Sequence, residues 1–114
     1  MTRVYKILPR ADWDAAVKAG RFEGSGVDAR DGFIHFSTAA QAQETAAKHF
    51  AGQAGLTLAG FDAAALGEAL RWEPSRNGDL FPHLYAVLDP ALAAEVRDLA
   101  LGADGVPQIG GLIP

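Results

Sequence analysis

The chain has 114 residues, of which 49% are hydrophobic and 21% charged, a mixture typical of globular domains and unlike that of disordered segments or coiled coils. This length provides one hydrophobic core, so we expect a single domain over residues 1–114. There is no cysteine, which excludes disulfide frameworks, thiol catalysis and cysteine-ligated zinc or iron–sulfur sites.

The formal net charge is −4, but the charges are unevenly distributed. Residues 1–30 hold six basic and four acidic side chains, and the remainder holds four basic and ten acidic ones. This balance argues against general nucleic-acid binding. Two explanations fit the basic residues near the N-terminus, a local basic rim or unrelated surface cations: Arg3, Lys6, Arg10, Arg21 and Arg30.

No segment of the chain has the apolar run of a signal peptide or of a membrane-spanning helix. We therefore expect a cytoplasmic protein that does not bind membranes.

The first half of the chain predicts two strands, each followed by a helix. Pro9 and Gly20 stand where a helix would begin and end, and Thr38 with Gln41 matches a capping box before an alanine-rich run. The predicted elements are strands over residues 3–8 and 33–37, helices over 9–20 and 38–50, and a glycine-rich loop over 21–32.

The second half predicts further short strands. Asp62 and Asp89 can each cap a helical segment, and the run 74–82 is dense in turn residues. The predicted elements are strands over 56–62, 71–73 and 83–88, helical segments over 63–70 and 90–96, and two short strands around Asp104 and Gly105. Five or more strands with a few short helices predict an α+β fold with a mixed or mostly antiparallel sheet.

Two predicted strands each carry a histidine followed two residues later by a hydroxyl. Side chains alternate along a strand, so His35 shares a face with Ser37, and His83 shares one with Tyr85. If the two strands are neighbours, these faces form one polar cluster. Imidazole and phenol groups suit a polar small molecule that contains an aromatic ring.

Glu73 and Trp72 belong to the same strand, loop and strand unit as His83, so they join the candidate site by proximity in sequence. Each candidate also has a structural explanation. A lone strand histidine is more often a hydrogen-bonded structural residue, and Thr38 is well explained as a helix cap. His49, near the end of a predicted helix, fits an interaction with the helix dipole, and Trp13 fits the core.

Other common sites match less well. The three histidines are far apart in sequence and lack the H-x-x-x-H and H-E-x-x-H spacings of zinc sites, so no metal is expected. The chain also lacks the glycine-rich phosphate loops and the G-x-S-x-G elbow of serine hydrolases.

Several segments together resemble the small bacterial domain-of-unknown-function family 952, and the resemblance covers nearly the whole chain. They are "VYKI", Trp13, "DGFIHFST" with the following Gln41, "LTLAGFD", "LRWEP" and "FPHLYAVLD", of which "GFIHFST" and "FPHLY" are the most specific. Members look like ADP-ribosyltransferases in fold, which implies a split, mostly antiparallel sheet and a cleft that holds NAD.

The resemblance also implies roles for individual residues. His35, Ser37 and Thr38 would contact a ribose of NAD and the nicotinamide amide. Tyr85 would stack on nicotinamide, with Trp72 as the second candidate.

The glutamate that positions the ribose in many transferases has no clean match in this chain. Glu73 precedes the strand that carries His83 and Tyr85, and Glu95 lies in no recognisable catalytic context. His83 or Glu73 would stabilise the positive charge that develops at the anomeric carbon, or activate the acceptor.

The sequence therefore predicts a domain that binds NAD or another nucleotide as a substrate and that catalyses ADP-ribosyl transfer to an acceptor the sequence does not identify. Two alternatives stay open. One is a non-catalytic domain that binds a small ligand or a protein through the same cleft. The other is a metal-dependent hydrolase that uses His35, His83 and a carboxylate.

Overall fold

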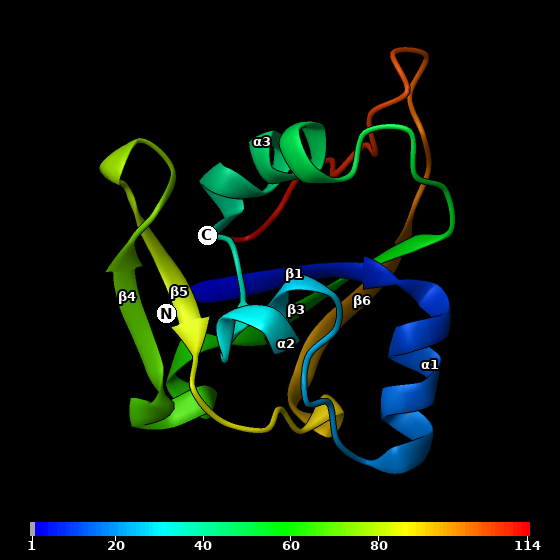
Figure 1. Ribbon diagram of the computed structural model, residues 1–114. Coiled ribbons are helices and arrows are strands. Elements are labelled where there is room, and N and C mark those ends of the chain that lie inside the picture. Colours follow the sequence, from blue (N-terminus) through cyan, green and yellow to red (C-terminus); the bar gives the residue numbers. More distant parts are fainter. Residues whose placement is uncertain (1) are drawn as a thin grey trace.

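The computed structural model describes residues 2–114, which form two three-stranded antiparallel sheets (Figure 1). One sheet has the order β1–β3–β6 and the other β2–β5–β4. The strands are β1 (Arg3–Pro9), β2 (Ile34–His35), β3 (Leu56–Asp62), β4 (Leu70–Pro74), β5 (Leu80–Leu84) and β6 (Ala93–Leu99). The helices are α1 (Arg10–Ala19), α2 (Val27–Asp31) and α3 (Ala39–His49), with shorter 3-10 segments η1 (Ala63–Ala69), η2 (Arg76–Gly78) and η3 (Pro90–Leu92). The α+β class with antiparallel pairing is confirmed.

The two sheets are joined at Tyr5 and Ser37. The backbone N–H of each residue donates to the carbonyl oxygen of the other, and both N···O distances are 2.8 Å. Ser37 thus connects β1 of the first sheet to the chain that leaves β2 in the second. Residues next to this junction are held by both sheets at once.

β1 separates two hydrophobic clusters because its side chains alternate. Val4 and Leu8 point into the cluster that α1 covers, where Trp13 packs edge to face on Phe61 with ring centroids 6.3 Å apart. Tyr5, Ile7 and their neighbours form the second cluster under α3. The predicted core position of Trp13 is confirmed, since it is 5% exposed.

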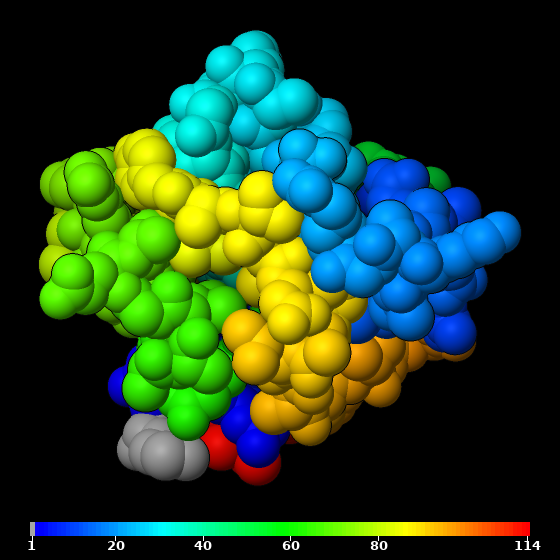
Figure 2. All heavy atoms as spheres, turned by 90° about the horizontal axis from the view of Figure 1, so that it is seen from below, coloured from blue at the N-terminus to red at the C-terminus, as the bar shows by residue number. Residues whose placement is uncertain are grey.

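One face of the molecule is formed by segments far apart in the sequence. The N–H of Tyr85 donates to the carbonyl of Ala69 at 2.9 Å, and Phe22 and Leu88 exchange backbone hydrogen bonds. Figure 2 shows this face, with the segment after β5 in yellow between the green segment around η1 and the blue and cyan segments of α1 and α2. The segment after β5 is therefore fixed on both sides.

The helix predicted over residues 90–96 is wrong. Only Pro90–Leu92 form a 3-10 turn, which Asp89 caps as expected, and the chain from Ala93 onward is strand β6. The alanine and glutamate of this run have good helix propensity, but pairing with β3 from Leu56 to Phe61 outweighs it.

Other element boundaries also differ. The predicted loop over 21–32 contains the short helix α2, and the strand predicted over 83–88 lies at Leu80–Leu84. Pro82 has no N–H to donate within β5, but its carbonyl accepts from the N–H of Phe36 at 3.0 Å. The two strands predicted around Asp104 reduce to a single bridge between Leu101 and Pro107.

None of the helices within residues 2–114 has the length and apolar character needed to span a bilayer.

Candidate functional site

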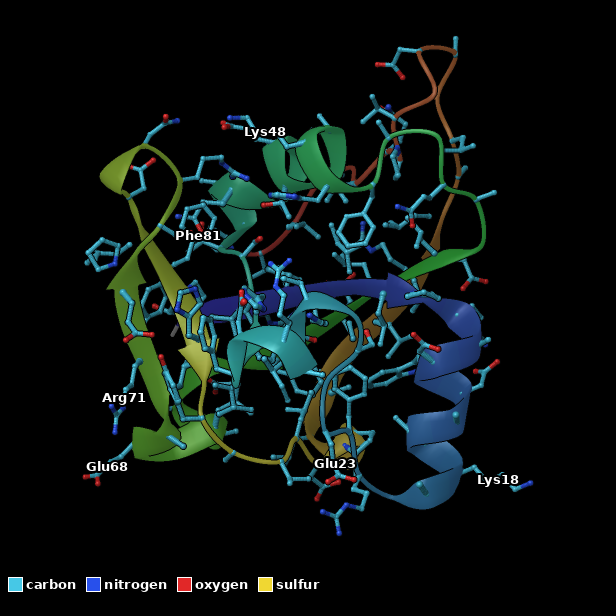
Figure 3. All side chains as sticks on the ribbon, in the orientation of Figure 1. Lys18, Glu23, Lys48, Glu68, Arg71 and Phe81 are labelled. Carbon is cyan, nitrogen blue, oxygen red and sulfur yellow. The ribbon has the colours of Figure 1, made fainter. Side chains whose placement is uncertain are left out.

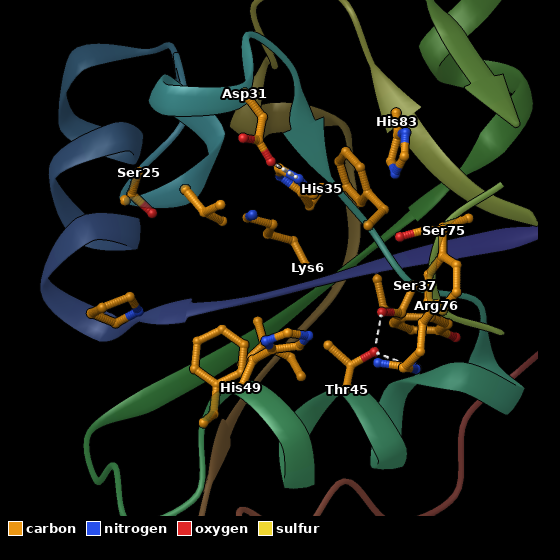
Figure 4. A pocket seen from close by; sticks show the side chains of 18 of the residues that line it. Lys6, Ser25, Asp31, His35, Ser37, Thr45, His49, Ser75, Arg76 and His83 are labelled. Atoms are coloured by element: carbon orange, nitrogen blue, oxygen red, sulfur yellow. Dashed lines mark hydrogen bonds and ion pairs between the residues drawn. The ribbon is translucent and has the colours of Figure 1, made fainter. Parts of the chain in front are cut away.

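A pocket of about 630 Å³ lies along the edge of β1, between α2 and β2 on one side and α3 on the other (Figure 4). All three histidines of the chain line it, although they come from three elements: His35 from β2, His83 from β5 and His49 from the end of α3. Figure 4 shows His35 and His83 on one side of β1 and His49 on the other. Titratable and aromatic side chains together make up much of the pocket lining.

His35 and His83 face each other because β2 and β5 are neighbours, as the sequence pattern required. They are directly opposed in the antiparallel ladder, and their ring centroids are 5.5 Å apart. Phe33 packs on both imidazoles, with centroid distances of 4.5 Å to His35 and 4.2 Å to His83. The two histidines therefore form one packed group with little rotational freedom.

His35 is held by two carboxylates from α2. Its Nδ1 lies 2.6 Å from Asp28 Oδ1, and its Nε2 lies 3.0 Å from Asp31 Oδ2. Gly32, with φ 83°, ends α2 in the left-handed region and returns the chain so that His35 meets both acids. A neutral imidazole donates from only one nitrogen, so donation to both carboxylates at once needs a proton on each ring nitrogen.

Asp28 also pairs with a buried cation. Lys6 Nζ lies 2.9 and 2.7 Å from the two oxygens of Asp28, and these residues are 7% and 2% exposed. Burial by itself would raise the pKa of Asp28, but the hydrogen bond from His35 and the charge of Lys6 together hold that pKa at about 2. Burial lowers the pKa of Lys6, and Asp28 offsets part of this effect. Lys6, Asp28 and His35 thus form a charged chain at the pocket wall.

His83 is oriented by a single carboxylate. Its Nδ1 lies 2.8 Å from Glu73 Oε1, and the Tyr85 hydroxyl donates to the same oxygen at 2.6 Å. These hydrogen bonds, from Tyr85 first and then His83, lower the pKa of Glu73, and the bond to Glu73 raises the pKa of Tyr85.

Nε2 of His83 has no partner in residues 2–114. Because no fully buried polar side-chain atom of that part of the chain lacks a partner, this nitrogen meets solvent, although the residue is 6% exposed. When Nδ1 carries the proton that Glu73 accepts, Nε2 has a free lone pair and can accept a proton or a hydrogen bond. His83 therefore has the arrangement of an oriented general base.

Hydroxyl groups continue the pocket wall beyond the histidines. Ser37 Oγ lies 2.9 Å from Thr45 Oγ1, and Arg76 Nη2 donates to the same threonine oxygen at 3.3 Å. Thr38, in contrast, caps α3: its side chain accepts from the N–H of Gln41, and the Gln41 side chain accepts from the N–H of Thr38. The predicted capping box is confirmed.

The structure brings only some of the predicted site residues into the pocket. His35, Ser37 and His83 line it, while Glu73 stands behind His83 and Thr38 is not among the lining residues. Tyr85 lines a separate, shallower hollow of about 360 Å³, where its ring contacts Phe33 at 5.1 Å.

Trp72 alternates with Glu73 along β4, so it faces the other side of the sheet. It is 41% exposed and lines neither hollow.

Several residues of the site were missed by sequence reasoning or given another role. The sequence leaves Lys6 either in a local basic rim or as an unrelated surface cation, and it favours a helix-dipole role for His49, but both residues line the pocket. A lysine in the middle of an apolar strand is a signal that could have indicated a buried partner. Asp28 and Asp31 precede His35 by seven and four residues, but only the turn at Gly32 makes that spacing meaningful.

The described part of the chain contains no set of metal ligands. Among residues 2–114, no three histidine, aspartate or glutamate side chains are grouped so that they could hold a metal ion. Both carboxylates near His35 are hydrogen-bonded to its ring.

With this geometry established, we compared the chain with known proteins. The family model described as "Protein of unknown function (DUF952)" matches residues 7–96. The chain belongs to this family. No curated protein matches it.

Solved structures of a similar protein share the fold. The crystal structure of protein CC0527 from Caulobacter crescentus is 60% identical, with 96% of each chain covered and a TM-score of 0.93. The solution NMR structure of the same protein is 60% identical over 96% of this chain and 95% of that one, with a TM-score of 0.86. The family description and the descriptions of these structures name no activity.

Proposed function

We propose that this DUF952 protein binds NAD or a closely related nucleotide in the pocket along β1. The observation that carries the proposal is the convergence of all three histidines of the chain, from three different elements, on that one pocket. Its volume of about 630 Å³ lies within the range of about 300–1,000 Å³ that is typical of small-molecule sites.

The chemistry of the lining suits the parts of a dinucleotide. Arginine and lysine side chains favour phosphate groups, and the imidazoles and the Ser37 hydroxyl can hydrogen-bond ribose hydroxyls and an amide. The resemblance to ADP-ribosyltransferases assigns the ribose and nicotinamide contacts to His35 and Ser37, which both line the pocket. Tyr85 is less well suited to stack on nicotinamide, because Phe33 and the guanidinium of Arg71 already contact its ring.

ADP-ribosyl transfer is the reaction that we propose for this pocket. The bond between nicotinamide and the ribose anomeric carbon breaks, nicotinamide leaves with the bonding electrons, and the acceptor nucleophile forms the new bond. His83 Nε2 takes the acceptor's proton. Glu73 acts through His83 as a positioning residue, because its carboxylate is bound to His83 and Tyr85 and does not line the pocket.

A non-catalytic binding domain is the second candidate, and one observation favours it. Both ring nitrogens of His35 are bound to carboxylates of the same chain. The Glu73 carboxylate is likewise bound within the chain, by His83 and Tyr85. Side chains that are satisfied internally serve a rigid binding surface better than they serve proton transfer. The two candidates differ in turnover: only the transferase releases nicotinamide.

Calorimetric titration with NAD, ADP-ribose and nicotinamide tests the proposal. We expect His83→Ala to weaken NAD binding by about tenfold or more, since it removes a buried wall of the pocket. Trp72→Ala is the matched control from the adjacent strand, and it should leave the affinity within about twofold. Equal losses in both variants, or no binding of any of the three ligands to the wild type, would reject the proposal. Release of nicotinamide from NAD during the same incubation separates transfer from binding alone.

A further inference from the structure

The Arg76 side chain is a rigidly held cation at one end of the pocket. The β4–β5 turn and α3 form this end. Its Nε lies 3.0 Å from Glu44 Oε1, its Nη2 donates to Thr45 Oγ1, and its guanidinium carbon lies 4.8 Å from the centroid of the Phe81 ring. The side chain is 14% exposed, although it comes from the exposed turn between β4 and β5. The guanidinium is thus held in place before any ligand arrives.

The guanidinium keeps donors that the protein does not use. It carries five N–H groups, and its contacts in residues 2–114 engage only Nε and one hydrogen of Nη2. Nη1 has no partner in these residues, and no polar side-chain atom among them is both fully buried and unpartnered, so Nη1 meets solvent. Arg76 lines the pocket, which places these donors at its wall.

The neighbouring hydroxyls extend the donor set. Thr45 Oγ1 accepts from Arg76 and lies 2.9 Å from Ser37 Oγ, so the threonine proton can be donated to Ser37. The proton of Ser37 is then free for another acceptor. Figure 4 shows this chain of contacts running from Arg76 through Thr45 to Ser37. Ser37 is 5% exposed and also lines the pocket.

We propose that Arg76 and Ser37 form an oxyanion subsite that binds a phosphate group of the ligand. A planar guanidinium can donate two parallel hydrogen bonds to one phosphate, and the fixed orientation of Arg76 lowers the entropy lost on binding. The subsite rests on the proposed function, since it assigns the phosphate end of a nucleotide to the part of the pocket made by α3 and the β4–β5 turn. His35 and His83 are left for the ribose and its base.

Arg71 provides a matched control. It lies on the same β4–β5 hairpin as Arg76, but Figure 3 shows it directed to the outside, whereas Phe81 is directed inward towards α3. Arg71 does not line the pocket, and its guanidinium lies over the Tyr85 ring. Arg71→Gln and Arg76→Gln therefore remove the same charge from the same hairpin at different places.

The test is a titration of the wild type, Arg76→Gln, Arg76→Lys and Arg71→Gln with pyrophosphate, ADP-ribose, NAD and nicotinamide, followed by NMR or calorimetry. We expect Arg76→Gln to weaken pyrophosphate and ADP-ribose by about tenfold or more while nicotinamide is unaffected. Arg71→Gln should stay within about twofold of the wild type. Arg76→Lys should fall between them, because an ammonium group is a single-point donor. If Arg76→Gln does not fold, the affinity of Arg76→Lys for pyrophosphate tests the subsite.

Three results overturn the subsite: no pyrophosphate binding to the wild type, equal effects of the two glutamine variants, or full affinity in Arg76→Lys. Failure of the broader proposal gives a different result. If pyrophosphate binding depends on Arg76 but neither NAD nor nicotinamide binds, the phosphate subsite stands and the NAD assignment is rejected. If NAD binds independently of Arg76, the NAD assignment stands and the phosphate subsite is rejected.

Discussion

His35 and His83 lie directly opposite each other across the β2–β5 ladder, with their rings 5.5 Å apart, but their surroundings give them different roles. His35 contacts a carboxylate through each ring nitrogen, whereas His83 contacts one carboxylate and keeps Nε2 free. The first arrangement engages both ring nitrogens, and the second leaves one ring nitrogen available to a ligand. Titratable pairs held in unlike environments are a common basis for acid and base roles in enzymes.

Asp28→Asn tests the charged chain behind His35. The pKa of Asp28 is about 2, below its ordinary value of 3.8, so its contribution is fully present above pH 3.8 and is lost as the pH falls towards 2. That shift corresponds to about 2 kcal/mol at neutral pH, and the uncompensated charge of Lys6 adds to the cost of the substitution. Urea unfolding at a series of pH values should show a deficit for Asp28→Asn at pH 7 that shrinks below pH 4. A deficit independent of pH would contradict this account.

Glu73→Gln tests the hydrogen bond that orients His83. Because the Glu73 carboxylate raises the pKa of the Tyr85 hydroxyl, its neutral replacement should move that pKa down towards 10. Alkaline titration of tyrosine absorbance measures the change, and Tyr85→Phe identifies which transition belongs to Tyr85. An unchanged transition in Glu73→Gln would mean that the hydrogen bond is not formed in solution.

Thr38→Ala separates helix capping from ligand binding. Thr38 caps α3 and does not line the pocket, so its loss should lower the free energy of unfolding by about 1 kcal/mol and leave ligand affinity unchanged. Thr38→Ser keeps the hydroxyl and should retain most of the stability. A loss of NAD affinity in folded Thr38→Ala, with Thr38→Ser normal, would restore the ligand contact that the family resemblance implies.

Gly60→Ala tests how the first sheet is packed. Gly60 lies opposite Tyr5 in the β1–β3 ladder, and an added Cβ would stand 2.7 Å from Tyr5 Cε1. The Tyr5 ring is 1% exposed and cannot move away easily, so we expect a loss of about 1–3 kcal/mol in thermal or urea unfolding. Gly111→Ala, where nothing lies within 4 Å of the added atom, is the control and should be nearly neutral. Similar stability of the two variants would show that the ring has room to shift.

The parts of the site that the sequence predicts are those set by local periodicity. Alternation along the first H-x-[hydroxyl] strand places His35 and Ser37 at the same pocket, and the capping box locates the start of α3. Pairing of the two strands then brings the histidines together. The alternation and the capping box can be recognised from a few neighbouring residues. The pairing of the two strands cannot.

The parts that the sequence does not predict depend on long-range contacts. Lys6 meets Asp28 and His49 meets the pocket only after β1, α2 and α3 have packed around the same edge. β5 ends at Leu84, and Tyr85, whose N–H donates to the carbonyl of Ala69, lines a different hollow. Strand β6 forms against helix propensity because β3 offers an open edge.

The most direct test of the central claim is an NMR titration of the imidazole signals with NAD, in protein without a histidine tag. The chain has three histidines, so each signal can be assigned by single substitution. If the pocket along β1 is the ligand site, the signals of His35, His49 and His83 should shift together and fit one dissociation constant. If NAD up to about 1 mM moves none of them, or moves His49 alone, the three histidines do not form a nucleotide site and the account is wrong.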